Sequence, residues 1–184
     1  ENRELYAYAL ENAKHFEASK VVAEEEGLRR SKVFYQIQNS RWRTIIIDRL
    51  KIHLPYILSA LGRSEFAVGN IEIQLTASND GDFFRMHADA NTELAAIVSR
   101  EITYVYYFSK EPRPFSGGGL VIYPSSPDPS NYETIRSLRK IEPRNNRLVA
   151  FRSNQLHELD LVSSPTRKFE DSRFTVNGWL HPAR

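Results

Sequence analysis

From residue 68 onward the chain alternates short β-rich runs with turn-forming segments. The runs are rich in β-branched and aromatic residues, and Gly, Pro, Asn and Asp gather between them. Short strands at this spacing predict a β-sandwich or barrel. The runs are NIEIQLTA (70–77), DFFRMHAD (82–89), EITYVYYFS (101–109), GLVIYP (119–124), RLVAFRS (147–153), LHELDLVS (156–163) and RFTVNGWLH (173–181).

The first sixty residues have a different residue pattern, which is typical of helices. Strong helix formers fill the beginning of the chain, and Leu5 and Ala9 recur at helical spacing. A second helix is expected over residues 40–61, where Pro55 would kink or divide it. Gly62 would then end this helix as a C-cap.

The helical pattern and the β-rich runs together predict one domain over residues 1–184 that is mainly β with N-terminal helices. We expect a helical support region (1–66) packed against a double-stranded β-helix, or jelly-roll, that forms the core (67–184). A length of 184 residues is sufficient for one domain with a sizeable core. No repeat or linker divides the chain.

Composition and charge narrow the classes of function. No apolar window is long enough to span a membrane, and the absence of cysteine excludes thiolate metal sites. A cytoplasmic location is the default expectation. The chain begins at Glu1 rather than Met, so we expect a trimmed N-terminus, and a lost targeting segment stays open.

The net charge of +2 argues against a dedicated nucleic-acid binder, for which a concentrated basic face is expected. Two local basic clusters are interpreted as solvated faces or partner contacts. They are Arg29-Arg30-Lys32 and the arginines and lysine between residues 136 and 147. The sequence does not set the oligomeric state.

His87 and Asp89 lie two residues apart in the run DFFRMHAD, so in a strand they would point to the same face. Alone, such a pair is a common chance occurrence. His157, which opens a later β-rich run, supplies a third ligand. Two imidazoles and one carboxylate on neighbouring strands form the 2-His-1-carboxylate set of non-haem Fe(II) oxygenases. The other histidines are interpreted as surface or structural residues: His15, His53 and His181.

Arg173 begins the last β-rich run and supplies a cation at the mouth of the predicted barrel. Its guanidinium could fork onto a carboxylate through two parallel hydrogen bonds. An enzyme that chelates a keto-diacid on Fe(II) needs such a partner for the far carboxylate. Arg167 and Lys168, in the segment before Arg173, are alternatives for the same role.

The chain resembles the Fe(II)/2-oxoglutarate-dependent dioxygenases, in particular their prolyl-hydroxylase-like branch. The resemblance covers roughly residues 70–181 and is carried by five motifs in order: DFFRMHAD, EITYVYYFSKE, GGGLVIYP, NRLVAFRSNQLHEL and RFTVNGWLH. It implies that His87, Asp89 and His157 bind iron. It also implies that Arg173 and the hydroxyl of Tyr106 hold the 5-carboxylate of 2-oxoglutarate.

Further positions follow from the same resemblance. Tyr104 is a second candidate near the cosubstrate, and Leu120, after the glycines, would pack against it. Asn177 and Trp179 are expected to alternate inward on the last strand and line the pocket, with Arg85 as another pocket candidate. The cofactors implied are Fe(II), 2-oxoglutarate and O₂, with ascorbate as a supporting reductant. Asp89 favours hydroxylation over halogenation, because related halogenases place a small residue there.

Two departures from the family pattern affect the pocket. The segment between His157 and Arg173 is longer than usual, and Thr76–Ala77 stands where relatives often have a tyrosine. The prolyl substrate of the family is therefore not assumed. Two long loops, 90–100 and 124–146, are expected to frame the entrance, and the second is long enough to suggest a lid or recognition loop.

The function expected is hydroxylation of a peptidyl residue such as proline, or of a free amino acid or peptide-like metabolite, with release of succinate and CO₂. Partners would be a protein, peptide or small-molecule substrate, with no membrane and no nucleic acid. One alternative is a metal-dependent jelly-roll enzyme that does not use 2-oxoglutarate. Another is a catalytically silent jelly-roll binding module, against which the intact set of metal ligands and Arg173 argues.

Overall fold

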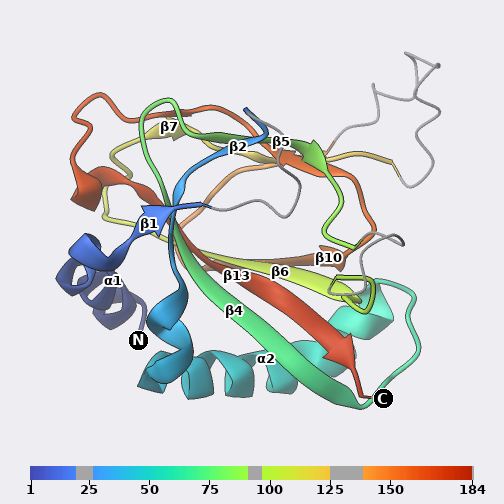
Figure 1. Ribbon diagram of the computed structural model, residues 1–184. Coiled ribbons are helices and arrows are strands. Elements are labelled where there is room, and N and C mark those ends of the chain that lie inside the picture. Colours follow the sequence, from blue (N-terminus) through green and yellow to red (C-terminus); the bar gives the residue numbers. More distant parts are fainter. Residues whose placement is uncertain (20–26, 91–96, 125–138, 184) are drawn as a thin grey trace.

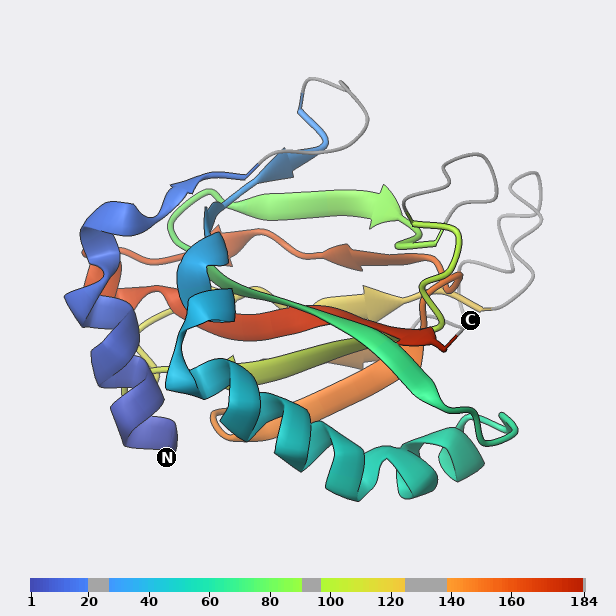
Figure 2. The same ribbon diagram turned by 60° about the horizontal axis from the view of Figure 1, so that its bottom comes forward.

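A computed structural model describes residues 1–19, 27–90, 97–124 and 139–183. Two antiparallel sheets face one another as a double-stranded β-helix, which confirms the predicted jelly-roll, and a helical layer covers one of them (Figures 1 and 2). The larger sheet has the order β1-β3-β4-β13-β6-β10, and the smaller has the order β2-β5-β11-β8-β9. A short ribbon pairs β12 with β7.

The strands have the following bounds: β1 Glu17–Ala18, β2 Arg29–Arg30, β3 Lys32–Phe34, β4 Val68–Ser78, β5 Phe83–His87, β6 Ile102–Phe108, β7 Ser116–Gly117, β8 Leu120–Ile122, β9 Arg139–Ile141, β10 Arg147–Arg152, β11 His157–Leu159, β12 Val162–Ser163 and β13 Arg173–Pro182. The α-helices are α1 Asn2–Glu11 and α2 Arg41–Ala60. Short 3₁₀ helices occupy Ala13–His15, Tyr35–Asn39 and Phe169–Asp171. All seven predicted β-rich runs contain strands.

Helix α2 begins and ends as its sequence predicts. The hydroxyl of Ser40 accepts a hydrogen bond from the backbone N–H of Trp42, which caps the N-terminus. At the other end Gly62 has φ +61°, and the N–H of Arg63 donates to the carbonyl of Leu58 in a Schellman motif. Pro55 lies inside the helix without dividing it, so of the two expected effects, a kink or a division, the division is wrong.

The larger sheet is apolar on one face and polar on the other, and this difference positions the site. Alternate residues point to opposite faces of a strand. Toward α1 and α2 lie the core residues Ile71, Ile73, Leu75 and Ala77 of β4, Ile102, Tyr104 and Phe108 of β6, and Phe174, Val176 and Leu180 of β13. Toward the smaller sheet lies a cavity lined by Gln74, Thr76, Ser78, Thr103, Val105, Arg173, Thr175, Asn177 and Trp179.

The helical character expected for the first sixty residues is wrong for the described residues between Glu11 and Ser40. The described part of this segment contains three short strands and two 3₁₀ helices instead. Val33 pairs with Thr76 of β4, and the ring of Phe16 stacks on Phe34 at 5.6 Å between centroids. Pairing with β4 therefore overrides the local helix propensity. No helix in the described residues is long and apolar enough to cross a membrane.

Candidate metal and cosubstrate site

The three predicted metal ligands meet in the cavity between the two sheets. His87 ends β5 and pairs directly with His157, the first residue of β11, while Asp89 lies just beyond the end of β5. Nε2 of His87 is 3.6 Å from Oδ1 of Asp89, and Nε2 of His157 is 3.4 Å from Oδ2. One ligand atom from each residue lies within 4.8 Å of the others, so a single ion could contact all three.

Both imidazoles are oriented by a backbone carbonyl two residues earlier in the chain. Nδ1 of His87 lies 2.7 Å from the carbonyl oxygen of Arg85, and Nδ1 of His157 lies 2.9 Å from that of Gln155. Because a carbonyl can only accept, each Nδ1 carries the proton and each Nε2 keeps its lone pair for a metal. Nε2 of His87 is buried without a hydrogen-bond partner in the described part of the chain, which fits a metal ligand.

The third ligand, Asp89, is a buried carboxylate. Its Oδ2 accepts a hydrogen bond of 2.8 Å from the hydroxyl of Thr103. Burial by itself raises the pKa of the Asp89 carboxyl, but the His157 and His87 rings outweigh it and hold that pKa well below its usual range. Burial lowers the pKa of the His157 imidazole. One charged oxygen donor and neutral nitrogen donors are what a divalent iron site needs.

Arg173 lines the same cavity and is only 5% exposed. Its Nε donates a 2.8 Å hydrogen bond to the carbonyl of Gly118, and its guanidinium lies 4.9 Å from the centre of the Tyr107 ring. It forms no ion pair with an acidic side chain of the described residues. A buried cation without a counter-ion is costly, so the position suits an anionic ligand.

The glycines before β8 make room for this arginine. Gly118 has φ +66°, and a Cβ added there would lie 2.7 Å from Cδ of Arg173. A side chain at this position would therefore displace the guanidinium as well as strain the backbone. The glycine at position 118 is therefore needed to leave space for the side chain of Arg173.

The alternatives to Arg173 lie elsewhere. The side chain of Arg167 is 80% exposed and forms an ion pair of 3.0 Å with Asp80. Lys168 is exposed as well. Neither residue lines the cavity that holds the three metal ligands.

The two tyrosines predicted to contact the cosubstrate point away from the cavity. Tyr106 donates a hydrogen bond to Oδ1 of Asn146 and accepts one from Asn2, on the helical side of the sheet. Tyr104 is buried on that side and donates to the backbone carbonyl of Glu72. By alternation along β6, the tyrosine that contacts Arg173 is Tyr107, one residue from the prediction.

The remaining predicted residues divide between the cavity and the surface. Leu120, Asn177 and Trp179 line the cavity. Arg85 does not: its side chain is exposed, and its guanidinium lies over the ring of Phe83 at 5.0 Å. Arg85 contributes its backbone carbonyl to the site instead of its charge. The loops expected at the entrance lie largely outside the described residues.

Arg29 belongs to the site although its sequence context indicated a solvated face. It lines the cavity, and its guanidinium lies 4.9 Å from the centre of the Phe84 ring. Phe84 in turn stacks on the His87 ring at 3.5 Å between centroids. No signal in the sequence separates Arg29 from its exposed neighbour Arg30, because the difference arises from the pairing of β2 with β5.

A jelly-roll that holds a 2-His-1-carboxylate cluster defines the class of non-haem Fe(II) oxygenases. Residues 73–181 match the profile of the 2OG-Fe(II) oxygenase superfamily, and the chain belongs to that family. Fe(II), 2-oxoglutarate and O₂ are the cofactors that this family implies, and His87, Asp89 and His157 could hold the metal.

Individual relatives agree with this assignment. An uncharacterised PKHD-type hydroxylase of Synechocystis sp. PCC 6803 is 39% identical over 180 residues, which are 98% of this chain and 59% of the relative. A Pseudomonas putida prolyl-4-hydroxylase has a similar fold, with a TM-score of 0.71 at 17% identity over 99% of this chain and 86% of that one. A Trichoplax adhaerens prolyl hydroxylase, in complex with a peptide fragment, gives 0.67 at 17% identity over 97% and 76%.

Proposed function

We propose that this chain carries the catalytic site of an Fe(II)- and 2-oxoglutarate-dependent hydroxylase. The observation that supports it most strongly is the pairing, in one cavity, of a largely buried three-residue cluster with a buried arginine that has no acidic partner among the described residues. When bound by His87, Asp89 and His157, Fe(II) would supply O₂ activation coupled to oxidative decarboxylation of 2-oxoglutarate. One oxygen atom would enter the substrate and the other would enter succinate, with loss of CO₂.

The protein's own contribution is orientation. Nδ1 of each histidine is anchored to a carbonyl, so both imidazoles present a fixed lone pair. Arg173 would receive the 5-carboxylate of 2-oxoglutarate through its Nη donors, because its Nε already bonds Gly118. The Tyr107 ring beneath the guanidinium and the side chain of Leu120 would exclude water from that end of the cavity.

The substrate proposed is a peptidyl residue, with proline as one candidate, or a free amino acid or peptide-like metabolite. The Trichoplax relative binds a peptide, which supports the first class. Asn177 and Trp179 would contact the substrate from β13. The formal charges of Fe(II), Asp89, Arg173 and 2-oxoglutarate cancel, so Arg29 leaves one positive charge in the cavity. That charge favours a substrate with a carboxylate near the reacting carbon.

Anaerobic titration with Fe(II) and 2-oxoglutarate tests the proposal. Chelation of the keto acid on Fe(II) should give a weak visible charge-transfer band in the wild type. His157→Ala should lose the band, whereas His53→Ala, at an exposed position on α2, should keep it. A wild type that binds the metal without a band would favour the jelly-roll enzyme that does not use 2-oxoglutarate, and a wild type that binds no metal would favour a silent module.

A further inference from the structure

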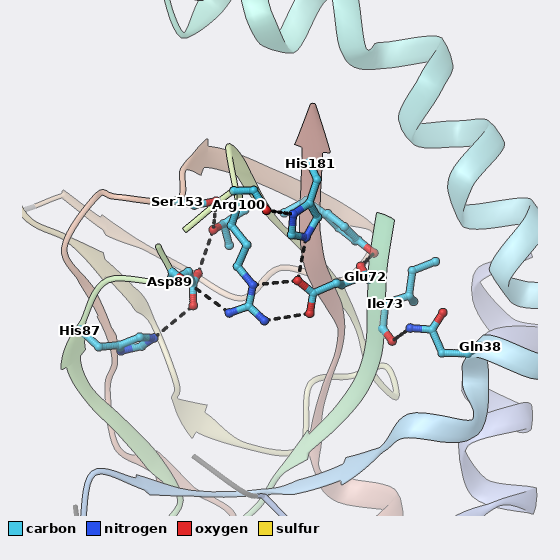
Figure 3. Close-up of polar contacts among 11 residues, drawn as sticks. Gln38, Glu72, Ile73, His87, Asp89, Arg100, Ser153 and His181 are labelled. Carbon is cyan, nitrogen blue, oxygen red and sulfur yellow. Dashed lines mark hydrogen bonds and ion pairs between the residues drawn. The ribbon is translucent and has the colours of Figure 1, made fainter. Parts of the chain in front are cut away.

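Arg100 connects Asp89 to the larger sheet through three hydrogen bonds and one aromatic contact of its guanidinium. Nε and Nη2 each donate a 2.8 Å hydrogen bond to a different carboxylate oxygen of Glu72. Nη1 donates to the backbone carbonyl of Asp89 at 3.2 Å. The guanidinium carbon also lies 3.5 Å from the centre of the Trp179 ring. Figure 3 shows Arg100 between Asp89 and Glu72.

Glu72, on β4, is itself held by residues of two other strands. Nε2 of His181, on β13, lies 2.8 Å from Oε1 of Glu72. The hydroxyl of Ser99 lies 2.9 Å from Nδ1 of the same ring, so it can donate there while Nε2–H donates to the carboxylate. The backbone carbonyl of Glu72 accepts from Tyr104 on β6. Burial alone raises the pKa of the Glu72 carboxyl, but Arg100 outweighs it and lowers that pKa, which keeps the carboxylate charged.

Asp89 needs such a support because it lies beyond the last residue of β5. Ladder pairing with β11 holds His87, whereas two hydrogen bonds within the described part of the chain hold the backbone at Asp89 and Ala90. One is the bond from Arg100, and the other is the 2.9 Å bond from the N–H of Ala90 to the carbonyl of Ser153. Without Arg100 the backbone would lose one of these bonds, and the Thr103 hydroxyl would still donate to the carboxylate.

We propose that the Glu72–Arg100 pair is a positioning element of the metal centre. It fixes the backbone of Asp89 and the ring of Trp179, so that the carboxylate and the substrate wall keep their relative geometry. This role rests on the proposed metal site, but not on the use of 2-oxoglutarate. An ion pair with a merely structural role would affect folding stability and leave the intrinsic metal affinity unchanged.

The test measures the Kd for Co(II), together with its visible d–d spectrum, on the full chain without 2-oxoglutarate. Arg100→Gln should weaken Co(II) binding by about 10- to 100-fold, the usual effect of removing a group that orients a ligand. The matched control is Arg63→Gln, which breaks another partly buried ion pair, with Glu101, that does not contact a ligand. The control should bind Co(II) within about twofold of the wild type.

Further variants keep the proposal falsifiable if Arg100→Gln fails to fold. Glu72→Gln keeps the shape but loses the charge, and Arg100→Lys keeps the charge but cannot form the two-pronged contact. Both should weaken Co(II) binding and alter the d–d spectrum. Wild-type affinity and spectrum in either variant, with only a lower unfolding temperature, would overturn the proposal. A wild type that binds no Co(II) would instead refute the metal site itself.

Discussion

Replacing Arg173 with Met should abolish tight binding of 2-oxoglutarate while leaving the apoprotein folded. Truncating one partner of a buried, hydrogen-bonded charge pair costs about 2–5 kcal/mol. At about 1.4 kcal/mol for each factor of ten, this predicts a Kd for 2-oxoglutarate that rises by roughly 30- to several thousand-fold. Arg173 is 5% exposed, so solvent screening should not reduce the effect toward the value for surface pairs.

The same change should have a small effect on the stability of the apoprotein. Loss of the bond to Gly118 destabilises by about 1 kcal/mol, but removal of a buried cation that pairs with no acidic side chain in the described ranges offsets it. For a chain of this size we expect the midpoint of thermal unfolding to stay within about 4 °C of the wild type. Loss of 2-oxoglutarate binding can then be separated from unfolding.

The assay is anaerobic titration of the Fe(II)-loaded protein with 2-oxoglutarate. Binding is measured by isothermal titration calorimetry and by the intensity of the charge-transfer band. Arg167→Met is the matched control, because its 80% exposed side chain pairs with Asp80 outside the cavity. The control should bind 2-oxoglutarate within about twofold of the wild type. An equal effect in the two variants, or a larger one at Arg167, would refute the assignment of the carboxylate partner.

Three further predictions follow from the site. Co(II) affinity should be full at neutral pH and fall in acid, because a proton then competes with the metal for Nε2 of His157. Burial lowers the pKa of this imidazole, so the loss should begin below the ordinary value of about 6.5, and a constant Kd from about pH 8 to about pH 5 would contradict the prediction. Tyr107→Leu should raise the Kd for 2-oxoglutarate severalfold in calorimetry, and Tyr106→Leu should not. A larger effect of Tyr106→Leu would instead support Tyr106 as the tyrosine that contacts the cosubstrate. If Arg29 attracts the carboxylate of the substrate, free amino acids and N-acetyl amino acids should perturb the charge-transfer band more than their amides do. Arg29→Gln should remove this difference, and the control Arg85→Gln should keep it. Equal responses of the wild type to acids and amides would exclude the carboxylate subsite.

The candidate metal ligands could be predicted because their chemistry restricts residue types as well as spacing. His87, Asp89 and His157 were inferred from a same-face pair and one later histidine, and the structure brings them together. Arg173 was one of three candidate cations in the sequence. Burial separates it from the other two, and burial depends on the packing of the whole barrel.

The tyrosine assignment failed for a specific physical reason. Strand β6 carries tyrosines on both faces and is covered on both, by helices on one side and by the opposite sheet on the other. Hydrophobic alternation therefore cannot show which of Tyr106 and Tyr107 faces the cavity. The local sequence also could not show strands of two or three residues such as β1 and β2, because long-range pairing stabilises them. Because β2 was not predicted, the position of Arg29 in the cavity was not predicted either.

The fate of O₂ tests the central claim most directly. The protein should be incubated with Fe(II), 2-oxoglutarate and ¹⁸O₂, and the succinate formed should be analysed by mass spectrometry, with His157→Ala as the inactive reference. The proposed function predicts succinate that carries one ¹⁸O atom from O₂, formed by the wild type and not by the variant. Absence of succinate in the wild type, or succinate without the label, would contradict a 2-oxoglutarate-dependent oxygenase.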